Sequence, residues 1–468
     1  MQLNLKFKDI ESAKPVLIQA AKSQLNVIFS NVCTDSRAIK SGDLFFAFKG
    51  DKFDAHEYIE QVFSSGAAAC VVNQYWYEDN KDNFKDKFLI SVDSVESYFA
   101  RLATVYRKRF DIPIIAIGGS NGKTSVKEMT AAVLSRKYNV LKTEGNLNNH
   151  LGVPMTIFRL HSEHEIAVVE IGTNHFGELD YLCEILEPGL GLLTNIGNEH
   201  LEFFGDLEGV TKAESELFEY LGENDGTAFL NTDDDLLKTL FPLLKKFITY
   251  GFNNKPAIKG EFITLDAAAC AEISVKGPVG ETAIQLPIPG KHTANNALAA
   301  ATVGIYFGVS LPEIKIALET VKTASKRMEV IERNGIVFLS DCYNANPDSL
   351  NAALDTLKQM QNTGRKIAVL GDMREMGKEA ANAHREAGKK IASLDFDLIC
   401  TFGEMMKLVY NEVQNVSEKK SIHFENKSEL TDYLKKNLTV GDVVLMKASR
   451  ASRLEEVLER FIHPSQYP

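Results

Sequence analysis

Cysteine is sparse in this sequence, with six residues in 468, and no two of them form a C-x-x-C pair. Their wide spacing argues against both a disulfide framework and a zinc site. Most of them are therefore expected to be small core side chains in a reducing compartment. The six are Cys33, Cys70, Cys183, Cys270, Cys342 and Cys400.

Long hydrophobic runs are also missing. No apolar stretch approaches the roughly 20 residues that a membrane-spanning helix needs. Residues 1–10 alternate polar and apolar side chains, and they lack the basic segment and the continuous apolar segment of a signal peptide. No membrane insertion is expected, and the cytoplasm is the predicted location.

Basic side chains are fewer than acidic ones. The chain has 52 Lys and Arg residues and 63 Asp and Glu residues, which gives a formal net charge of -11. Nucleic-acid backbones are held by clustered Lys and Arg, so this balance argues against a nucleic-acid partner. It does not exclude an anionic small substrate, which a few basic groups and helix N-termini can hold.

The length of 468 residues exceeds what one hydrophobic core supports, and roughly 150 residues per domain suggests about three domains. Alternating strand and helix patterns predict an α/β fold. We expect a small N-terminal α/β domain over residues 1–93 and a central P-loop ATPase-like domain with a parallel sheet over residues 94–322. A C-terminal Rossmann-like domain over residues 323–468 is expected to follow.

Short apolar runs mark the expected strands, and a helix over residues 94–110 should link the first domain to the second. The polar stretch 79–87 is expected to be a surface loop. The expected strands cover residues 67–72, 114–117, 166–169, 191–196, 336–339, 367–370, 398–401 and 443–446.

A glycine-rich segment follows the strand that ends at Ile117 and precedes a helical pattern. Glycines let backbone N–H groups surround phosphate oxygens, and the helix N-terminus adds partial positive charge. In such a loop Lys123 would meet the outer phosphates and Thr124 would bind magnesium. The strict G-x-x-x-x-G-K-[ST] form is not met, because Ile117 takes its first glycine position, and an ordinary glycine-rich turn is the alternative. The segment consists of Gly118, Gly119, Ser120, Asn121, Gly122, Lys123, Thr124 and Ser125.

Two candidate metal ligands follow other expected strands. Glu170 comes directly after residues 166–169, and His200 lies shortly after residues 191–196. Side chains just past the carboxyl ends of parallel strands face the ligand crevice of an open α/β sheet. Taken singly, such a Glu or His is more often a capping or surface residue than a ligand. Their joint occurrence with the glycine-rich loop favours a shared site.

Several segments resemble those of the Mur ligase family in order and spacing, and the resemblance spans nearly the whole chain. In the third expected domain, the Tyr-Asn-Ala-Asn-Pro sequence that begins at Tyr343 is similar to the branch that adds D-alanyl-D-alanine. The D-N-P-R motif of sister ligases that add diaminopimelate is absent from the sequence. The similar segments are residues 119–124, 146–154, 169–175, 194–202, 289–297, 341–349, 370–373 and 447–450.

The resemblance implies an ATP-dependent ligase that joins D-alanyl-D-alanine to UDP-N-acetylmuramoyl-tripeptide in peptidoglycan precursor synthesis. The substrate carboxylate would be activated as an acyl phosphate, and the amine would then displace phosphate. ATP and Mg2+ are the implied cofactors, with Lys123 offsetting charge. Thr124 and Glu170 are assigned to one magnesium ion and His200 to a second. The site would be complete only when the second and third domains close on ATP.

The resemblance also assigns binding residues, each of which could instead be a surface, capping or turn residue. Asn296 would hydrogen-bond adenine, while Arg327 and Asp341 would bring the third domain onto the nucleotide. Ser36 and Arg37 would bind the UDP moiety, in a domain where Ala55 replaces the usual glycine. A monomer is expected. The residues along the UDP-muramoyl-peptide would be Asn148, Asn149, Asn174 and His175.

One position departs from the family pattern. In most Mur ligases a lysine about fourteen residues beyond the metal-binding histidine reacts with carbon dioxide, and its carbamate binds metal. Counted from His200, this position is Glu214, and the nearest lysine is Lys212. A two-residue offset turns a helical side chain by about 200°, so Lys212 would face away from the site. We predict that Glu214 supplies the carboxylate directly; a solvated helix residue is the alternative.

Three other interpretations compete with this one. Another amide ligase of the superfamily, such as a folylpolyglutamate synthetase-like or sister Mur enzyme, would share the loop but use a different acceptor. A catalytically silent nucleotide-binding homologue would keep the fold without the reaction. A P-loop kinase would need a hydroxyl acceptor and would not explain the flanking domains.

Overall fold

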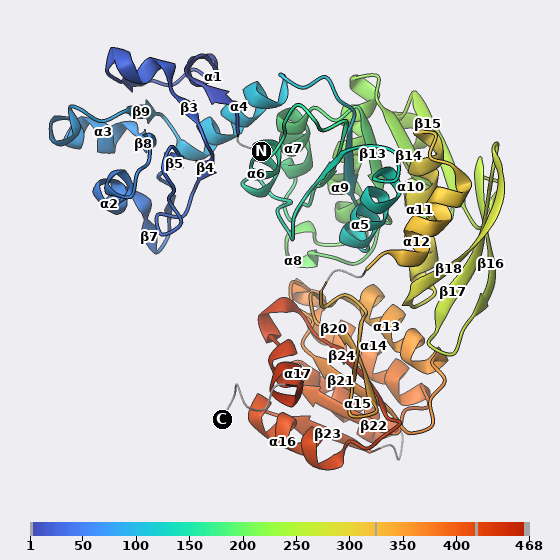
Figure 1. The fold of residues 1–468 in the computed structure, drawn as a ribbon. Helices are drawn as coiled ribbons and strands as arrows, with labels where there is room; N and C mark the ends of the chain where they lie inside the picture. The colour runs from blue at the N-terminus through green and yellow to red at the C-terminus, as the bar shows by residue number, and fades with distance from the viewer. Residues whose placement is uncertain (1–2, 323–324, 417–419, 463–468) are drawn as a thin grey trace. The chain divides into compact units, whose positions relative to one another are not determined.

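The computed structural model describes residues 3–322, 325–416 and 420–462. Its chain divides into two compact units. The first contains residues 1–116, 138–173 and 177–191, and the second contains residues 117–137, 174–176 and 192–468. Strands and helices alternate along most of the chain, as Figure 1 shows, which confirms the predicted α/β class.

The N-terminal region forms a five-stranded sheet with the order β2-β9-β8-β5-β4, in which β2 runs antiparallel to β9 and the other pairs are parallel. Helices α1, α2 and α3 accompany it. Phe45, Val62 and Val72 belong to its core. The elements are α1 (Phe7–Ser12), β2 (Leu17–Gln19), β4 (Val32–Cys33), β5 (Leu44–Phe46), α2 (Ile59–Ser64), β8 (Ala69–Asn73), α3 (Gln74–Asn80) and β9 (Leu89–Val92).

The predicted loop at residues 79–87 is wrong in part. Helix α3 continues to Asn80, and a 3-10 helix covers Lys81–Phe84. The rings of Trp76 and Phe84 lie 5.6 Å apart, and both pack against the core of the N-terminal sheet. These aromatic contacts fix a turn that the polar composition of the stretch concealed.

Helix α4 (Val95–Arg107) follows the N-terminal sheet, in agreement with the helix expected over residues 94–110. The Ser94 hydroxyl accepts a hydrogen bond from the Ser97 N–H at 3.1 Å, which caps the helix N-terminus. Phe99, Leu102 and Tyr106 are buried at helical spacing along one face.

The central sheet has nine strands in the order β11-β12-β10-β13-β14-β15-β16-β17-β18. The pairs β11–β12, β14–β15 and β15–β16 are parallel, whereas β16, β17 and β18 pair antiparallel. The strands are β10 (Ile114–Gly118), β11 (Val140–Lys142), β12 (Ile166–Glu170), β13 (Leu190–Leu193), β14 (Thr227–Asn231), β15 (Lys246–Gly251), β16 (Ile258–Leu265), β17 (Cys270–Gly277) and β18 (Gly280–Pro289).

The sequence predicted a parallel sheet for the central domain and therefore missed its antiparallel strands. Strands β16 to β18 lack the short continuous apolar runs that mark buried parallel strands. Strand β13 also ends earlier than expected, and residues 194–197 form a loop that carries site residues. The helices of this region are α5 (Lys123–Leu134), α6 (Gly152–Ile157), α7 (Glu178–Leu186), α8 (Leu201–Phe204), α9 (Leu207–Glu223), α10 (Asp235–Thr239), α11 (His292–Tyr306) and α12 (Leu311–Thr320).

The C-terminal sheet has the order β19-β20-β24-β21-β22-β23, and all its pairs are parallel except β19–β20. The predicted strands agree with β20, β21, β22 and β24. The strands are β19 (Glu329–Arg333), β20 (Ile336–Asp341), β21 (Lys366–Gly371), β22 (Leu398–Phe402), β23 (Ser421–Phe424) and β24 (Val443–Lys447). The helices are α13 (Pro347–Gln359), α14 (Ala380–Ser393), α15 (Met406–Val416), α16 (Lys427–Asn437) and α17 (Glu455–Ile462).

Helices cover both faces of this C-terminal sheet. Leu434 of α16 and Val457 of α17 pack on the same face as Phe338, Val369 and Val444, whereas α13 packs against β21 and β24 from the other side (Figure 1). The carboxyl ends of β20, β21 and β24 consequently meet at one edge, the position where open α/β sheets bind ligands.

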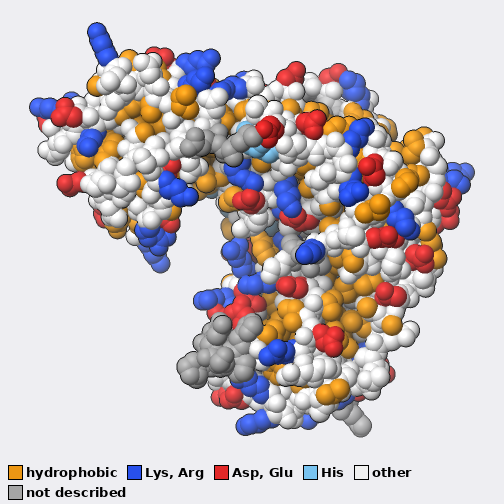
Figure 2. All heavy atoms as spheres, viewed as in Figure 1, with side chains coloured by type: hydrophobic (Ala, Val, Ile, Leu, Met, Phe, Trp, Pro, Cys, Tyr) orange, Lys and Arg blue, Asp and Glu red, His pale blue; other side chains and the backbone are white. Residues whose placement is uncertain are grey.

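All six cysteines lie in the described part of the chain, are buried and form no disulfide, in agreement with the sequence. Among the described residues, no helix is both long enough and apolar enough to cross a bilayer. Acidic and basic side chains are interspersed over the face shown in Figure 2.

Candidate active site

The glycine-rich loop connects the fully buried strand β10 to helix α5, which begins at Lys123. Gly119 and Gly122 adopt φ angles of +106° and +87°, which residues with a Cβ rarely take. A Cβ on Gly119 would lie 2.6 Å from the Thr194 nitrogen, and one on Gly122 would lie 2.7 Å from Oδ1 of Asn296. Both glycines are therefore required by conformation and by space.

A second loop, which follows β13, holds the glycine-rich loop in place. The Ser120 N–H donates to the Asn195 carbonyl at 2.9 Å, and the Asn121 N–H donates to Asn195 Oδ1 at 3.1 Å. The Thr194 hydroxyl donates to the Asn121 carbonyl at 2.7 Å. Because these N–H groups are used inside the protein, phosphate would be met by the first turn of α5 and by Lys123.

Lys123 lies among acidic groups. Its Nζ donates to the Gly119 carbonyl, to the Ser120 carbonyl at 3.3 Å and to Glu199 Oε2 at 3.3 Å. Glu214 Oε2 accepts the Gly119 N–H at 2.8 Å. The loop therefore carries one ammonium and two nearby carboxyl groups.

Burial is the main cause that raises the pKa of Glu214 to about 8, and the neighbouring Glu199 carboxylate adds to it. The Lys123 ammonium and the Gly119 N–H act in the opposite direction but are outweighed. Glu214 lies inside the site with 1% of its surface exposed, so it is not the solvated helix residue of the alternative interpretation. Lys212 is exposed and lies over the Phe176 ring at 5.5 Å, as expected for a side chain that faces away.

Three buried oxygen atoms in this region have no hydrogen-bond partner among the described residues. They belong to the Thr124 hydroxyl and to one carboxylate oxygen each of Glu199 and Glu214. Oxygen donors of this kind are what Mg2+ prefers, so the residues fit the expected metal. Within residues 3–322, 325–416 and 420–462, no group of three or more His, Cys, Asp or Glu side chains is placed to hold an ion alone. Phosphate oxygens would have to complete the coordination.

The two other predicted metal ligands, His200 and Glu170, contact different neighbours. His200 adopts a left-handed conformation with φ +47°, and its Nδ1 lies 2.8 Å from Glu375 Oε2. Its Nε2 lies 3.9 Å from Glu199 Oε2. Glu170, in the first unit, ends β12 and accepts the Asn148 side-chain N–H at 2.9 Å. The assignment of Thr124 and Glu170 to one Mg2+ and of His200 to a second stays a prediction.

In the C-terminal sheet, Asp341 ends β20 and pairs with Lys447 at the end of β24. The distance between Lys447 Nζ and Asp341 Oδ2 is 2.6 Å, and the lysine also donates to the Asn344 carbonyl at 2.9 Å. The Arg327 guanidinium lies over the Tyr343 ring at 3.9 Å. Lys447 thus neutralises Asp341 and anchors the segment that begins at Tyr343.

That segment contacts the glycine-rich loop within the second unit. Asn346 Nδ2 donates to Asn121 Oδ1 at 3.0 Å, and Asp348 Oδ2 accepts the Asn198 N–H at 2.8 Å. The sequence gives Asn346, Asp348 and Glu199 only as members of the family-like segments 341–349 and 194–202, without a role for any of them. Glu375 lies outside these segments, although it follows residues 370–373 closely.

The predicted substrate residues include several with local structural roles. Asn149 Oδ1 caps α6 by accepting the Gly152 N–H at 2.9 Å. The Arg37 guanidinium pairs with the Asp35 carboxylate at 2.8 Å, and this hydrogen bonding lowers the pKa of Asp35 to about 2. Ser36 is buried. Asn174 Oδ1 lies 2.9 Å from His175 Nδ1. Binding of the UDP-substrate by these residues stays a prediction.

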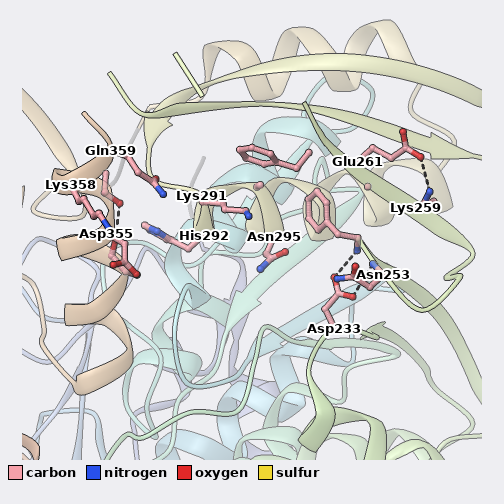
Figure 3. A pocket seen from close by; sticks show the side chains of 16 residues that line it. Asp233, Asn253, Lys259, Glu261, Lys291, His292, Asn295, Asp355, Lys358 and Gln359 are labelled. Carbon is pink, nitrogen blue, oxygen red and sulfur yellow. Dashed lines mark hydrogen bonds and ion pairs between the residues drawn. The ribbon is translucent and has the colours of Figure 1, made fainter. Parts of the chain in front are cut away.

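A cavity of about 870 Å³ opens beside the N-terminus of α11, where His292 and Asn295 line it. Figure 3 shows Lys291 and Asn295 at its wall, with Asn253 beside Asp233. Two phenylalanine rings also line it, and Lys291 Nζ lies 4.8 Å from the centre of the Phe262 ring. Aromatic rings together with side-chain amides can bind a flat heterocycle with polar edges.

Comparison with known proteins shows the family. Three family models match: the Mur ligase family catalytic domain over residues 28–106, the Mur ligase middle domain over residues 117–304, and the Mur ligase glutamate ligase domain over residues 326–450. The chain belongs to the Mur ligase family.

Individual relatives narrow the similarity to one branch. The chain is 33% identical to the UDP-N-acetylmuramoyl-tripeptide--D-alanyl-D-alanine ligase of Bacillus subtilis, with 93% of each chain covered. It resembles the crystal structure of MurF from Acinetobacter baumannii with a TM-score of 0.87, 29% identity and 99% coverage of both chains. The MurF ligase of Thermotoga maritima in complex with ADP matches with a TM-score of 0.79 at 27% identity, covering 93% of this chain and 98% of that one.

Proposed function

We propose that this chain is an ATP-dependent ligase that joins D-alanyl-D-alanine to UDP-N-acetylmuramoyl-tripeptide through an acyl phosphate, in peptidoglycan precursor synthesis. The near full-length similarity to ligases of that name supports it. The observation that carries it is the hydrogen bond between Asn346 and Asn121. This bond joins the segment that begins at Tyr343, which is typical of the D-alanyl-D-alanine-adding branch, to the glycine-rich loop. The third domain thereby contacts the loop that would bind the phosphates of ATP.

Charge control dominates the proposed reaction, because a phosphoryl group must approach an anionic carboxylate. Lys123 stands on the loop with its ammonium held by backbone carbonyls and Glu199, and it can turn to the outer phosphates. Thr124 and Glu170 would hold one Mg2+ and His200 a second. Bound magnesium would neutralise phosphate charge and stabilise the charge that develops on the transferred group.

The nucleotide is proposed to lie along the N-terminus of α11. Asn296 directs Oδ1 towards Gly122 and would hydrogen-bond adenine, while the neighbouring cavity would receive the base and ribose. Arg327 is held over Tyr343 beside the Asp341–Lys447 pair, from where it can reach a phosphate or ribose. Closure of the second and third domains on ATP would exclude water from the acyl phosphate.

We assign the UDP-substrate to the first domain, through Ser36 and Arg37. Three domains with the boundaries 93/94 and 322/323 are proposed, the latter beside residues outside the described ranges. The enzyme would act as a monomer in the cytoplasm. The residues proposed to line the muramoyl peptide are Asn148, Asn149, Asn174 and His175.

Glu214 is proposed to take the place of the carbamylated lysine. Its position supports this, because the side chain is buried at the loop, keeps one carboxylate oxygen without a partner and lies near Glu199 and Lys123. A glutamate can provide this charge without reacting with carbon dioxide, because a bound cation would keep the buried carboxyl group ionised despite its raised pKa.

Coupled phosphate release tests the function. UDP-tripeptides with diaminopimelate or with lysine at the third position are supplied side by side, with D-alanyl-D-alanine, with single amino acids, or without acceptor. Release that depends on D-alanyl-D-alanine supports the proposal. Release that depends on a single amino acid would identify a sister ligase, and no release with any acceptor would indicate a silent homologue.

A further inference from the structure

Two arginine side chains lie against the ring of Tyr343 at the end of the C-terminal sheet. Tyr343 follows strand β20 by two residues, and Arg450 follows the neighbouring strand β24 by three (Figure 1). The guanidinium carbon of Arg450 lies 5.7 Å from the centre of the Tyr343 ring, and that of Arg327 lies 3.9 Å from it. Contacts of this kind hold a guanidinium group in place without neutralising its charge.

The charge of these two arginines is not offset by a carboxylate. Arg450 is exposed, and within the described part of the chain neither its guanidinium group nor that of Arg327 has a hydrogen bond or an ion pair. The basic residues close to them in sequence are all paired. The pairs are Lys326–Glu455 at 3.0 Å, Lys447–Asp341 at 2.6 Å and Arg453–Glu456 at 2.7 Å. The carboxyl edge of the sheet therefore carries two guanidinium groups that can bind an anion.

The turn that carries Arg450 is fixed by the sheet. The Ser449 N–H donates to the Asp372 carbonyl, just beyond strand β21, at 3.1 Å, and Ser449 is buried. Arg450 then begins a 3-10 helix of three residues. A ligand would consequently have to order only the Arg450 side chain and not its backbone, which lowers the entropy cost of binding.

The Tyr343 ring also stands a short length of chain away from the phosphate-binding loop. Three residues beyond Tyr343, Asn346 Nδ2 donates to Asn121 Oδ1 at 3.0 Å. Three residues span at most about 11 Å, and an extended dipeptide spans about 7 Å. A dipeptide with one end at the loop can therefore extend its other end towards Tyr343 and Arg450.

The proposed acceptor has a charge at this other end. D-alanyl-D-alanine carries its reacting amine at one end and a carboxylate at the other. The planar fork of an arginine binds a carboxylate through two parallel hydrogen bonds. A single amino acid carries its carboxylate about 3.6 Å nearer to the amine, so a guanidinium group at a fixed place can distinguish the two acceptors by length.

We propose that Arg450 binds the C-terminal carboxylate of the acceptor, and that Tyr343 holds the Arg450 guanidinium group at the distance that fits a dipeptide. Arg327, which lies closer to the same ring, remains with the nucleotide. Tyr343 thus keeps one arginine for each of the two anionic ligands. The inference rests on the proposed function, from which it takes the dipeptide acceptor.

Steady-state phosphate release tests this carboxylate site with two acceptors. They are D-alanyl-D-alanine and D-alanyl-D-alanine amide, in which a neutral group of similar size replaces the carboxylate. The kcat and KM for each acceptor and the KM for ATP are measured for the wild type, Arg450→Gln and Arg450→Lys. Arg453→Gln, which removes an exposed cation three residues further on, is the matched control.

The wild type should use the free acid about 100-fold better than the amide in kcat/KM, because the amide cannot form the charged pair of hydrogen bonds. Arg450→Gln should raise the KM for the free acid by about 30-fold to 100-fold, leave the KM for ATP within about 3-fold, and use the two acceptors almost equally. Arg450→Lys keeps the charge without the fork and should lie between the wild type and Arg450→Gln. Arg453→Gln should match the wild type.

A wild type that uses the amide as well as the free acid would overturn the proposal, and this comparison needs no variant. A raised KM for ATP in Arg450→Gln, with the free acid still preferred over the amide, would assign Arg450 to the nucleotide and overturn it as well. Failure of the proposed function looks different, because the wild type would then release no phosphate with D-alanyl-D-alanine, and this inference would fall with it. Thermal unfolding of each variant checks that the fold is kept.

Discussion

Nδ1 of His200 and the Glu375 carboxylate lie 2.8 Å apart, although 175 positions separate the two residues in sequence. Both adopt positive φ angles, +47° and +65°, so both are held in a conformation that costs free energy. The His200 side chain beside it lowers the pKa of Glu375 despite its partial burial. A carboxylate on Nδ1 fixes the ring so that Nε2 faces Glu199 and the phosphate-binding loop.

Glu375 should therefore position His200. We expect Glu375→Gln to lower kcat by about 10-fold to 100-fold, the usual effect of removing a carboxylate behind a metal-binding histidine. The KM for ATP should change little, because no nucleotide contact is assigned to Glu375. Steady-state phosphate release measures both constants, with Glu379→Gln as the control at an exposed position nearby. An unchanged kcat would contradict the positioning role.

Lys123→Ala should lower kcat by at least about 100-fold while the fold is kept, since its ammonium faces carbonyls and a carboxylate rather than a core. The matched control is Lys246→Ala, which removes an exposed ion pair with Asp225. Phosphate release and circular dichroism separate activity from folding. Equal turnover by Lys123→Ala and the control would refute the assignment.

Glu214→Ala should strongly depress activity, and wild-type activity should not respond to the removal of bicarbonate. Both expectations follow from a buried carboxylate at the position where a carbamate would otherwise stand. Lys212→Ala is the control, because this lysine is exposed and faces Phe176. Full activity of Glu214→Ala would show the hypothesis to be wrong. A loss of wild-type activity in bicarbonate-free buffer that only carbamylation of Lys212 can explain would do the same.

Ligase activity should require Mg2+ or Mn2+. We expect this because the buried oxygens of Thr124, Glu199 and Glu214 that have no hydrogen-bond partner can bind a divalent metal ion. Excess chelator should remove turnover, and added Mg2+ should restore it. Turnover that persists in chelator would refute metal dependence.

The C-terminal sheet offers a stability test with a defined pH dependence. Burial alone would raise the pKa of Asp442, but hydrogen bonds from Arg365 and from the backbone hold it below its ordinary value. Asp442 is fully buried, and Arg365 Nη2 lies 2.6 Å from its Oδ2. A depressed carboxylate pKa stabilises the fold above the pKa of the unfolded chain, about 3.9, and this contribution is lost as pH falls below it.

We expect Arg365→Ala to lower the free energy of unfolding by about 2 kcal/mol at pH 7, since it leaves a buried carboxylate without its main partner. The difference from the wild type should shrink as pH falls below about 4. Urea unfolding followed by circular dichroism measures it. Lys389→Ala, which breaks an exposed helical pair with Glu386, should lower the free energy of unfolding far less. Equal losses for the two variants would contradict the prediction.

The phosphate-binding loop was predictable because its signals are local. Strand β10, two glycines at positive φ and Lys123 at the start of α5 follow one another within ten residues. The strands of the C-terminal sheet were predictable for a similar reason, since each is a short apolar run between helical patterns.

Contacts between distant segments were not predictable in this way. Glu199 meets Lys123 across 76 positions, and Asn346 meets Asn121 across 225. Nothing in the sequence around an isolated glutamate or asparagine indicates which distant loop it will touch. The antiparallel strands β17 and β18 were missed because half-buried alternation is a weaker signal than a continuous apolar run.

The six buried cysteines can report how often each part of this chain unfolds. Burial raises the pKa of Cys270, Cys342 and Cys400 to about 12, and a thiol that stays protonated and covered does not react with alkylating reagents. Labelling can then proceed only when the surrounding structure opens. The six thiols fall two by two within residues 1–93, 94–322 and 323–468. Mass spectrometry of timed alkylation would therefore rank the three regions by how often each unfolds, and would show which of them ATP or the UDP-substrate slows.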